Sequence, residues 1–540
     1  MSSGFTRLFA TRRGFDLWPA ALSGLLLAGA FPPLSWGFLG FFALIPLLLV
    51  AEKRPFASGF VAGVSFFAPL LYWLNIVMTT YGGLAPFFSG VAWLMLCAFL
   101  ALYFGAALWL GFLFQRRLGL ALVFTLPLLW VGGEYLRGHL FSGFPWGLIG
   151  YAAIDMPTLR QSADLLGVYG LSWLFVLVNC VGFLLIRHAR RRTTWLALGL
   201  TGLALAGTWF YGLHPRPQNS SPGKSLRVGL IQGNIAQQQK WDPAFRQTTL
   251  DTYKRLSLAA VKQGAELLIW PEAATPFYVQ EPGPDSRQVF DLVRQTAKPL
   301  LLGAPSYTLA AAGAYRYHNS AYLLDATGQV AGRSDKIHLV PFGEYVPLAK
   351  LLFFINKLVT GVGDYTPGQV NPLALNGHQL GVLICYEAIF PELARGYVKE
   401  GSDLLVNLTN DAWFGRSSAP RQLLDMTRMR AIENRIWIAR AANTGISALI
   451  TPNGQALNQT AIFTPSQLVG SVALGAAPTL YKRYGDSFAK ACLLLTALGL
   501  LLISLRRPPR NPLPQGTRKA HNPPRSPLNL RGEGKAVSDK

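Results

Sequence analysis

Long stretches of the chain contain no charged residue, and this feature limits the possible folds most. Asp, Glu, Lys and Arg are absent from residues 17–50, 55–115, 118–133, 165–186 and 193–213. A helix needs about 20 apolar residues to span the ~30 Å hydrocarbon core of a bilayer. Buried helices of a large soluble protein are the alternative, but runs of this length argue against them. The sequence therefore predicts a polytopic α-helical membrane protein.

Breaks within the runs and a late apolar segment set the expected number of spans. Pro32-Pro33 interrupts the first run, and a turn-like segment at 79–83 interrupts the second, so each should cross twice. We predict about eight transmembrane helices, near residues 17–31, 34–50, 57–79, 86–114, 118–138, 164–186, 193–213 and 487–505.

The rest of the chain divides around these spans. We expect a membrane domain at 1–213, an exported α/β domain at 214–486, a last span at 487–505 and a basic, disordered tail at 506–540. In the exported part, short β-rich runs such as 226–231, 380–385 and 403–408 alternate with helical patterns at 243–262, 286–297 and 419–435.

The positive charge of the chain is unevenly placed. Its net charge is +23, which could indicate a nucleic-acid partner. However, 20 of the 49 Lys and Arg lie before the first span, in alternate connections and in the tail. This is the positive-inside pattern of membrane proteins. It places both termini in the cytoplasm and residues 214–486 on the opposite side, and it removes the argument for nucleic acid.

One cysteine stands apart from the other three. Cys97, Cys180 and Cys492 lie in apolar spans, whereas Cys385 is alone in the exported domain and has no disulfide partner there. It could be a buried structural thiol or a nucleophile. It follows a strand-like run at 380–384 and precedes an expected helix, whose positive end would favour the thiolate. A nucleophile also needs a base and an oxyanion site.

Two segments can supply those groups. Glu272 ends a strand-like run within Trp270-Pro271-Glu272, and Lys336 precedes Pro341-Phe342-Gly343-Glu344-Tyr345. Together with Ile384-Cys385-Tyr386-Glu387, these motifs resemble, in order and spacing, the carbon–nitrogen hydrolase (nitrilase) superfamily. The resemblance implies an α-β-β-α sandwich with a Glu-Lys-Cys triad. With the spans added, the chain resembles the apolipoprotein N-acyltransferase family of that superfamily.

Roles can be assigned on this basis. Cys385 would be the nucleophile, Glu272 the base, and Lys336 the cation that stabilises the oxyanion. Supporting residues implied by the resemblance are Glu344, Tyr386, Glu387, Trp241 and Trp413. His338 is close to Lys336 in sequence, but with a glutamate available as base it is not expected to be catalytic.

The resemblance also implies a reaction and a location. The acyl donor would be a phospholipid, typically phosphatidylethanolamine, and the acceptor the α-amine of a diacylglyceryl-cysteine apolipoprotein, through a Cys385 thioester. The protein would lie in the bacterial inner membrane with its catalytic domain on the periplasmic side. No cofactor and no metal are implied. A membrane-anchored amidase and, less favoured, a transporter are the alternatives. An apolar segment at 352–363 is expected to dip into the bilayer.

Overall fold

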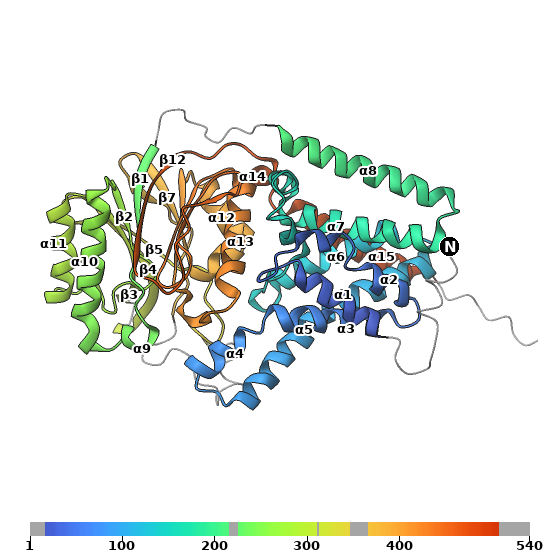
Figure 1. The fold of residues 1–540 in the computed structure, drawn as a ribbon, viewed down its shortest axis with the longest axis horizontal. Helices are drawn as coiled ribbons and strands as arrows, with labels where there is room; N and C mark the ends of the chain where they lie inside the picture. The colour runs from blue at the N-terminus through green and yellow to red at the C-terminus, as the bar shows by residue number, and fades with distance from the viewer. Residues whose placement is uncertain (1–16, 215–224, 310–312, 346–364, 507–540) are drawn as a thin grey trace, which may run out of the picture.

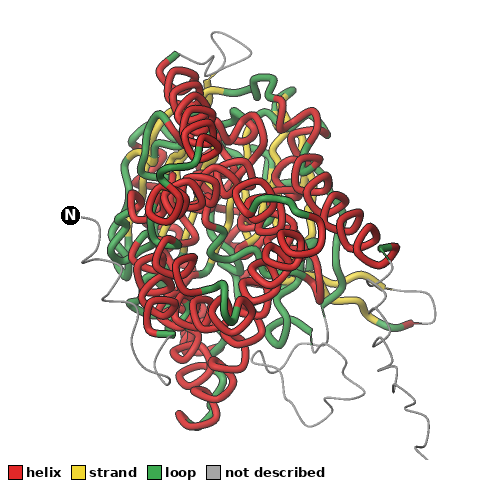
Figure 2. The backbone as a smooth tube through the Cα atoms, turned by 90° about the vertical axis from the view of Figure 1, so that its right-hand side faces the viewer, coloured by secondary structure: helices red, strands yellow, loops and turns green. Residues whose placement is uncertain are grey.

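A helical domain and an α/β domain lie side by side in the computed structural model (Figure 1), which describes residues 17–214, 225–309, 313–345 and 365–506. The predicted tail at 507–540 and the apolar segment 352–363 lie outside the described residues. In the view from the helical side, helices cover the strands behind them (Figure 2).

The helical domain contains long apolar helices. Among the described residues, four helices are long and apolar enough to cross a membrane, or five if the bent pair Pro55–Leu70 and Leu74–Tyr81 is one broken span. Many large apolar side chains on these helices are exposed, as expected for contact with lipid. The helices of this domain are α1 (Trp18–Gly29), α2 (Ile45–Val50), α3 (Pro55–Leu70), α4 (Leu74–Ile76), α5 (Pro86–Leu118), α6 (Leu122–His139), α7 (Ala163–His188), α8 (Arg192–Leu213) and α15 (Ser487–Leu505).

Four of the eight predicted spans are not matched by an unbroken helix that is long and apolar enough to cross a membrane. The one predicted at 118–138 is α6, which is not among the four such helices of the described residues. The segment predicted at 17–31 is a helix of only 12 residues, and the one at 34–50 is divided between a 3-10 turn at Gly37–Phe41 and the six-residue α2. At about 1.5 Å per residue, neither crosses ~30 Å alone. The segment predicted at 57–79 bends by 59° after α3, which contains Pro69. Proline removes a helical hydrogen bond and so favours such a break.

Two six-stranded sheets form the core of the α/β domain. The strand order is β12-β1-β2-β3-β4-β5 in the first sheet and β11-β10-β9-β8-β7-β6 in the second. The strands are β1 (Ser225–Gln232), β2 (Leu267–Ile269), β3 (Leu300–Leu309), β4 (Tyr315–Leu324), β5 (Val330–Asp335), β6 (Leu373–Leu375), β7 (His378–Ile384), β8 (Leu404–Thr409), β9 (Ile438–Ala442), β10 (Ala448–Ile450), β11 (Ala456–Leu457) and β12 (Ser466–Ala473).

Helices cover the outer faces of both sheets (Figure 1). Helices α10 (Arg246–Lys262) and α11 (Pro284–Thr296) pack on the first sheet, whereas α12 (Pro391–Lys399) and α13 (Ala419–Asn434) pack on the second. A separate apolar cluster, with members such as Leu230, Leu301 and Val406, fills the space between the sheets. The predicted nitrilase-like sandwich is therefore confirmed.

Helix α13 is also the main contact between the two domains. All of its residues except Arg421 are buried, because one face packs on the second sheet and the other on the helical domain. Gln422 shows how closely the domains fit, since its Oε1 accepts hydrogen bonds from the indoles of Trp146 (2.8 Å) and Trp73 (3.3 Å). The α/β domain thus packs directly on the apolar helices.

Candidate active site

The carboxyl ends of strands from both sheets carry the predicted catalytic residues. Glu272 follows β2, Lys336 follows β5 and Cys385 follows β7, and all three are at least 90% buried. Lys336 Nζ lies 3.5 Å from Glu272 Oε1. The charges of Glu272 and Lys336 both act on the Cys385 thiol. The structure therefore brings together three residues that the sequence separates by 113 positions.

Glu272 is fixed through both of its carboxylate oxygens. Asn319 Nδ2 donates to Oε1 at 2.9 Å, and the backbone N–H of Asn410 donates to Oε2 at 3.0 Å. Asn319 lies on β4 of the first sheet and Asn410 follows β8 of the second, so the carboxylate connects the two layers. Gly303 of β3 allows this position, because a Cβ there would lie 2.6 Å from the Cα of Glu272.

Lys336 and Glu344 form the closest ion pair of the cluster. Their Nζ and Oε1 atoms are 3.0 Å apart, and Glu344 also accepts hydrogen bonds from Asn319 and from the backbone of Val340. Burial opposes the charge of Lys336, but Glu344 and Glu272 outweigh it and raise the pKa of the ammonium above its usual value. Lys336 is thus a permanent cation.

The turn that carries Cys385 differs from the prediction. Cys385 begins a five-residue 3-10 turn with a left-handed φ of 57°, and helix α12 begins only at Pro391. Proline suits the first turn of a helix and keeps the residue before it extended, which explains the late start. The expected activation of the thiol by a helix end was therefore wrong. Burial and the charge of Glu272 raise the pKa of Cys385, so the thiol needs a base.

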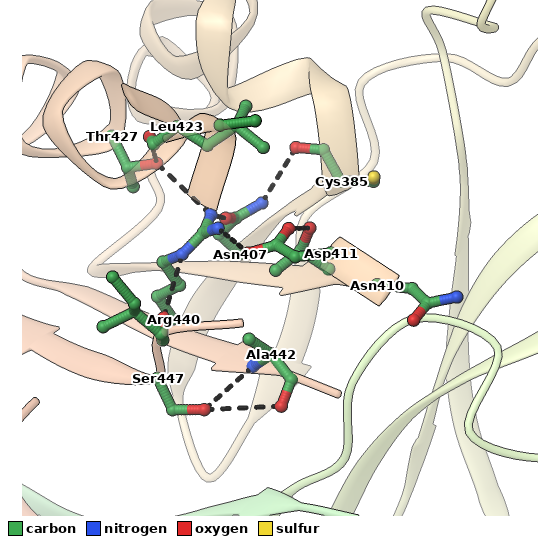
Figure 3. Close-up of polar contacts among 12 residues, drawn as sticks. Cys385, Asn407, Asn410, Asp411, Leu423, Thr427, Arg440, Ala442 and Ser447 are labelled. Carbon is green, nitrogen blue, oxygen red and sulfur yellow. Dashed lines mark hydrogen bonds and ion pairs between the residues drawn. The ribbon is translucent and has the colours of Figure 1, made fainter. Parts of the chain in front are cut away.

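A buried polar network holds this strained turn (Figure 3). Asn407 Nδ2 donates to the backbone oxygens of Leu383 (2.9 Å) and Cys385 (3.3 Å), and Arg440 donates to Asn407 Oδ1. Arg440 also pairs with Asp411 at 2.9 Å, and all three side chains are fully buried. The Cys385 carbonyl points into the network while its sulfur points away from it (Figure 3). Sequence patterns gave no indication of this support.

Two of the predicted supporting residues lie directly beyond Cys385. Glu387 is fully buried and accepts hydrogen bonds from the backbone N–H groups of Ile384 (2.6 Å), Ile337 (2.6 Å) and His338 (3.0 Å). It therefore fixes the Cys385 turn to the segment after Lys336, and burial raises its pKa to about 7. The hydroxyl of Tyr386 reaches Gly143 O of the helical domain at 3.4 Å.

The two predicted tryptophans lie further out. Trp241 follows α9 (Gln237–Lys240) and is 38% exposed. Trp413 packs edge-on against Tyr81 of the helical domain, with ring centroids 5.2 Å apart. The roles of both tryptophans stay predictions.

His338 packs against Phe390 with ring centroids 3.8 Å apart. Burial, followed by the charge of Lys336, lowers the pKa of His338 to about 4. His338 is therefore neutral near pH 7.

Comparison with known proteins adds independent information. Family models match two parts of the chain: an apolipoprotein N-acyltransferase N-terminal domain at residues 23–181 and a carbon-nitrogen hydrolase at 227–477. A protein named apolipoprotein N-acyltransferase in Geobacter metallireducens is 46% identical, over 88% of this chain and 93% of its own length. Another of that name in Nitrosomonas europaea is 33% identical, over 94% of this chain and 99% of its own.

The likeness to solved structures is more distant. An amidase from Nesterenkonia sp. is 23% identical and covers 50% of this chain and 97% of its own, with a TM-score of 0.36.

Proposed function

The chain belongs to the apolipoprotein N-acyltransferase family, and we propose that it transfers an acyl chain from a membrane phospholipid to the N-terminal α-amine of a diacylglyceryl-cysteine apolipoprotein. The observation that carries the proposal is the place of the Glu272, Lys336 and Cys385 cluster. The turn that follows Cys385 contacts the apolar helical domain through Tyr386 and Gly143. A substrate that stays in the bilayer can reach such a site without crossing water.

The first half of the reaction uses Cys385 and Glu272. Glu272 takes the thiol proton, and the thiolate attacks the ester carbonyl of the phospholipid. The resulting tetrahedral oxyanion collapses, the C–O bond breaks, and Glu272 returns the proton to the leaving alkoxide. The products are a lysophospholipid and a Cys385 thioester. The raised pKa of Cys385 makes this transfer to a base necessary.

The second half transfers the acyl group to the amine. The α-amine of the acceptor attacks the thioester, Glu272 takes one of its protons, and the C–S bond breaks. The departing thiolate then recovers the proton, which leaves an amide and the free enzyme. Lys336 stays charged in both halves because Glu344 pairs with it, so its field can stabilise each oxyanion.

Finer details follow from the family and from the charge pattern. The donor is phosphatidylethanolamine, and the membrane is the bacterial inner membrane, which the long apolar helices cross. The Lys- and Arg-rich connections keep both termini in the cytoplasm, so the α/β domain lies on the periplasmic side. The apolar helices support the membrane location, and the distribution of charge supports the orientation.

Intact-mass measurement tests the proposal. With phospholipid and no acceptor, the wild-type protein should gain one acyl mass, sensitive to neutral hydroxylamine, and Cys385→Ala should gain none. Glu272→Gln should not accumulate the adduct, and Lys336→Ala should form it roughly 10² times more slowly. Adding a diacylglyceryl lipopeptide should discharge the adduct into N-acylated peptide. Release of free fatty acid alone would instead favour the amidase-like hydrolase, and full turnover of Cys385→Ala would overturn the mechanism.

A further inference from the structure

A second lysine is buried beside the predicted catalytic residues. Lys240 is the last residue of α9 and is only 1% exposed. Its Nζ donates to the backbone oxygen of Glu272 at 3.1 Å. An ammonium has three N–H donors, and this is its one hydrogen bond among the described residues. Its other two donors therefore have no hydrogen-bond partner among the described residues.

Lys240 and Lys336 have different surroundings. Lys336 contacts Glu344 at 3.0 Å and Glu272 at 3.5 Å, so two carboxylates already oppose its charge. Within the part of the chain that the structure describes, Lys240 forms no ion pair with a carboxylate, and its contact with Glu272 is through the main chain. The carboxylates beside a paired cation cancel part of its field, whereas a cation without such a partner presents its full charge to new negative charge nearby.

The sulfur of Cys385 is close enough to act on Lys240. Burial lowers the pKa of Lys240 to about 8, and the charges of Glu272 and of a Cys385 thiolate oppose this effect. These two groups, which follow β2 and β7, are the charged neighbours that act on it. With both lysines charged, they balance the carboxylates of Glu272 and Glu344. This balance persists when the thiol proton moves to Glu272, because no charge enters or leaves the site.

We propose that Lys240 is a second cationic group of this active site, which stabilises negative charge on the Cys385 sulfur and on the tetrahedral oxyanion through its two free N–H donors. The proposal rests on the acyl-transfer function proposed above. The two lysines would have different roles. Lys336 is held by carboxylates, whereas the ammonium of Lys240 is available to the reacting atoms. Both donors would lie in a dry site, where such contacts are strongest.

Three variants test this role. Lys240→Met removes the charge at similar size, Lys240→Arg keeps a charge that does not titrate below pH 12, and Lys262→Met is the control, since Lys262 is exposed on α10. The rate of acyl-adduct formation from phospholipid is measured from pH 6 to 9.5, together with thermal unfolding in detergent. The wild-type rate should decline as the pH rises through about 8, where Lys240 loses its proton.

Each variant has its own expected result. Lys240→Met should form the adduct about 10² times more slowly at pH 7 and lose the decline near pH 8. Lys240→Arg should recover part of the rate and show no decline up to pH 9.5, and the control should match wild type. A merely structural role would lower the rate without changing its pH profile. A Lys240→Met protein with the wild-type rate and the same pH profile would overturn the inference.

A second readout separates this inference from the proposed function. Iodoacetamide alkylates Cys385 without any lipid, so its rate reports on the thiolate alone. Lys240→Met should slow this alkylation at pH 7 by at least about tenfold relative to Lys262→Met. If the wild-type protein forms no acyl adduct, the acyl-transfer function fails, and slower alkylation of Lys240→Met would still support the role at sulfur. Equal alkylation rates would overturn that role.

Discussion

Lys336 Nζ lies 3.0 Å from Glu344 but 3.5 Å from Glu272. The shorter ion pair is therefore made with the supporting carboxylate and not with the proposed base. Asn319 donates to both carboxylates at 2.9 Å and keeps them in this arrangement. Lys336 is thus paired mainly with Glu344 and more distantly with Glu272. Glu344 therefore leaves the Glu272 carboxylate, the proposed base, without a short ion pair to this cation.

Glu344→Gln should weaken the base rather than the nucleophile. Without the Glu344 charge, the Lys336 ammonium should move toward Glu272 and pair with the carboxylate that is proposed to take the thiol proton from Cys385. We expect adduct formation from phospholipid to slow by about 10²-fold, the lower end of the range for general acid–base catalysis. The control is Glu400→Gln, since Glu400 is exposed at the end of α12. A Glu344→Gln protein that forms the adduct at the wild-type rate would contradict this role.

His338 should affect acid stability and not catalysis. Its pKa is about 4 in the folded protein and about 6.5 when exposed, because burial disfavours the charged ring. Between these values the unfolded chain binds the extra proton, so the stability associated with a neutral His338 is present above pH 6.5 and is lost as the pH falls toward 4. His338→Phe should unfold less readily than wild type at pH 4.5, relative to pH 7.5, in thermal scans.

The same variant tests the choice of base. At pH 7.5, His338→Phe should keep acyl transfer within about threefold of wild type, a difference below 1 kcal/mol in the barrier, because a neutral ring packed on Phe390 can be replaced by phenylalanine. A loss beyond 10² would instead assign proton transfer to His338.

The strand-end positions of the candidate catalytic residues could be predicted from the sequence, but the residues that support them could not. Glu272, Lys336 and Cys385 each follow a strand, and strand ends are recognisable from short apolar runs. The left-handed turn at Cys385 depends instead on Asn407 and Arg440, which belong to other strands and contact it only after folding. Lys240 is similar, because no pattern in α9 distinguishes a buried lysine from an exposed one.

The domain contact was hidden for a related reason. Helix α13 carries Arg428 and Arg430, and Arg435 directly follows it, which usually indicates an exposed surface. In the structure these arginines are buried against Asp155, Glu433 and Asp164, and two of these three carboxylates come from the helical domain. Charge composition cannot reveal partners supplied by another domain. Helix ends in the apolar region were inaccurate because hydropathy measures the length of a run, not the breaks that packing and proline introduce.

The orientation in the membrane can be tested by reporter fusions. The positive-inside pattern predicts that a reporter active only outside the cytoplasm will work when inserted between residues 214 and 225 and fail when fused after residue 507. A reporter active only in the cytoplasm serves as the control and should give the opposite results. Activity of the outside reporter at the carboxyl end alone would reverse the proposed orientation.

Arg435 should be needed to hold the two domains together. Its guanidinium donates twice to Asp164 Oδ2, at 2.8 and 3.0 Å, and also to Gln161, while both charged side chains are almost fully buried. Arg435→Met leaves the Asp164 carboxylate without its charged partner, and breaking a buried pair in this way costs about 3–5 kcal/mol.

Arg421→Met, on the preceding helix α13, is the matched control, because that side chain is 37% exposed and its ion pairs are longer, 3.4 and 3.8 Å. Exposed pairs contribute about 1 kcal/mol or less. Thermal unfolding in detergent should therefore shift strongly for Arg435→Met and little for Arg421→Met. Adding Asp164→Asn to Arg435→Met should recover much of the loss, since the uncompensated charge is then gone; equal shifts for both single variants would show that the pair does not hold the domains together.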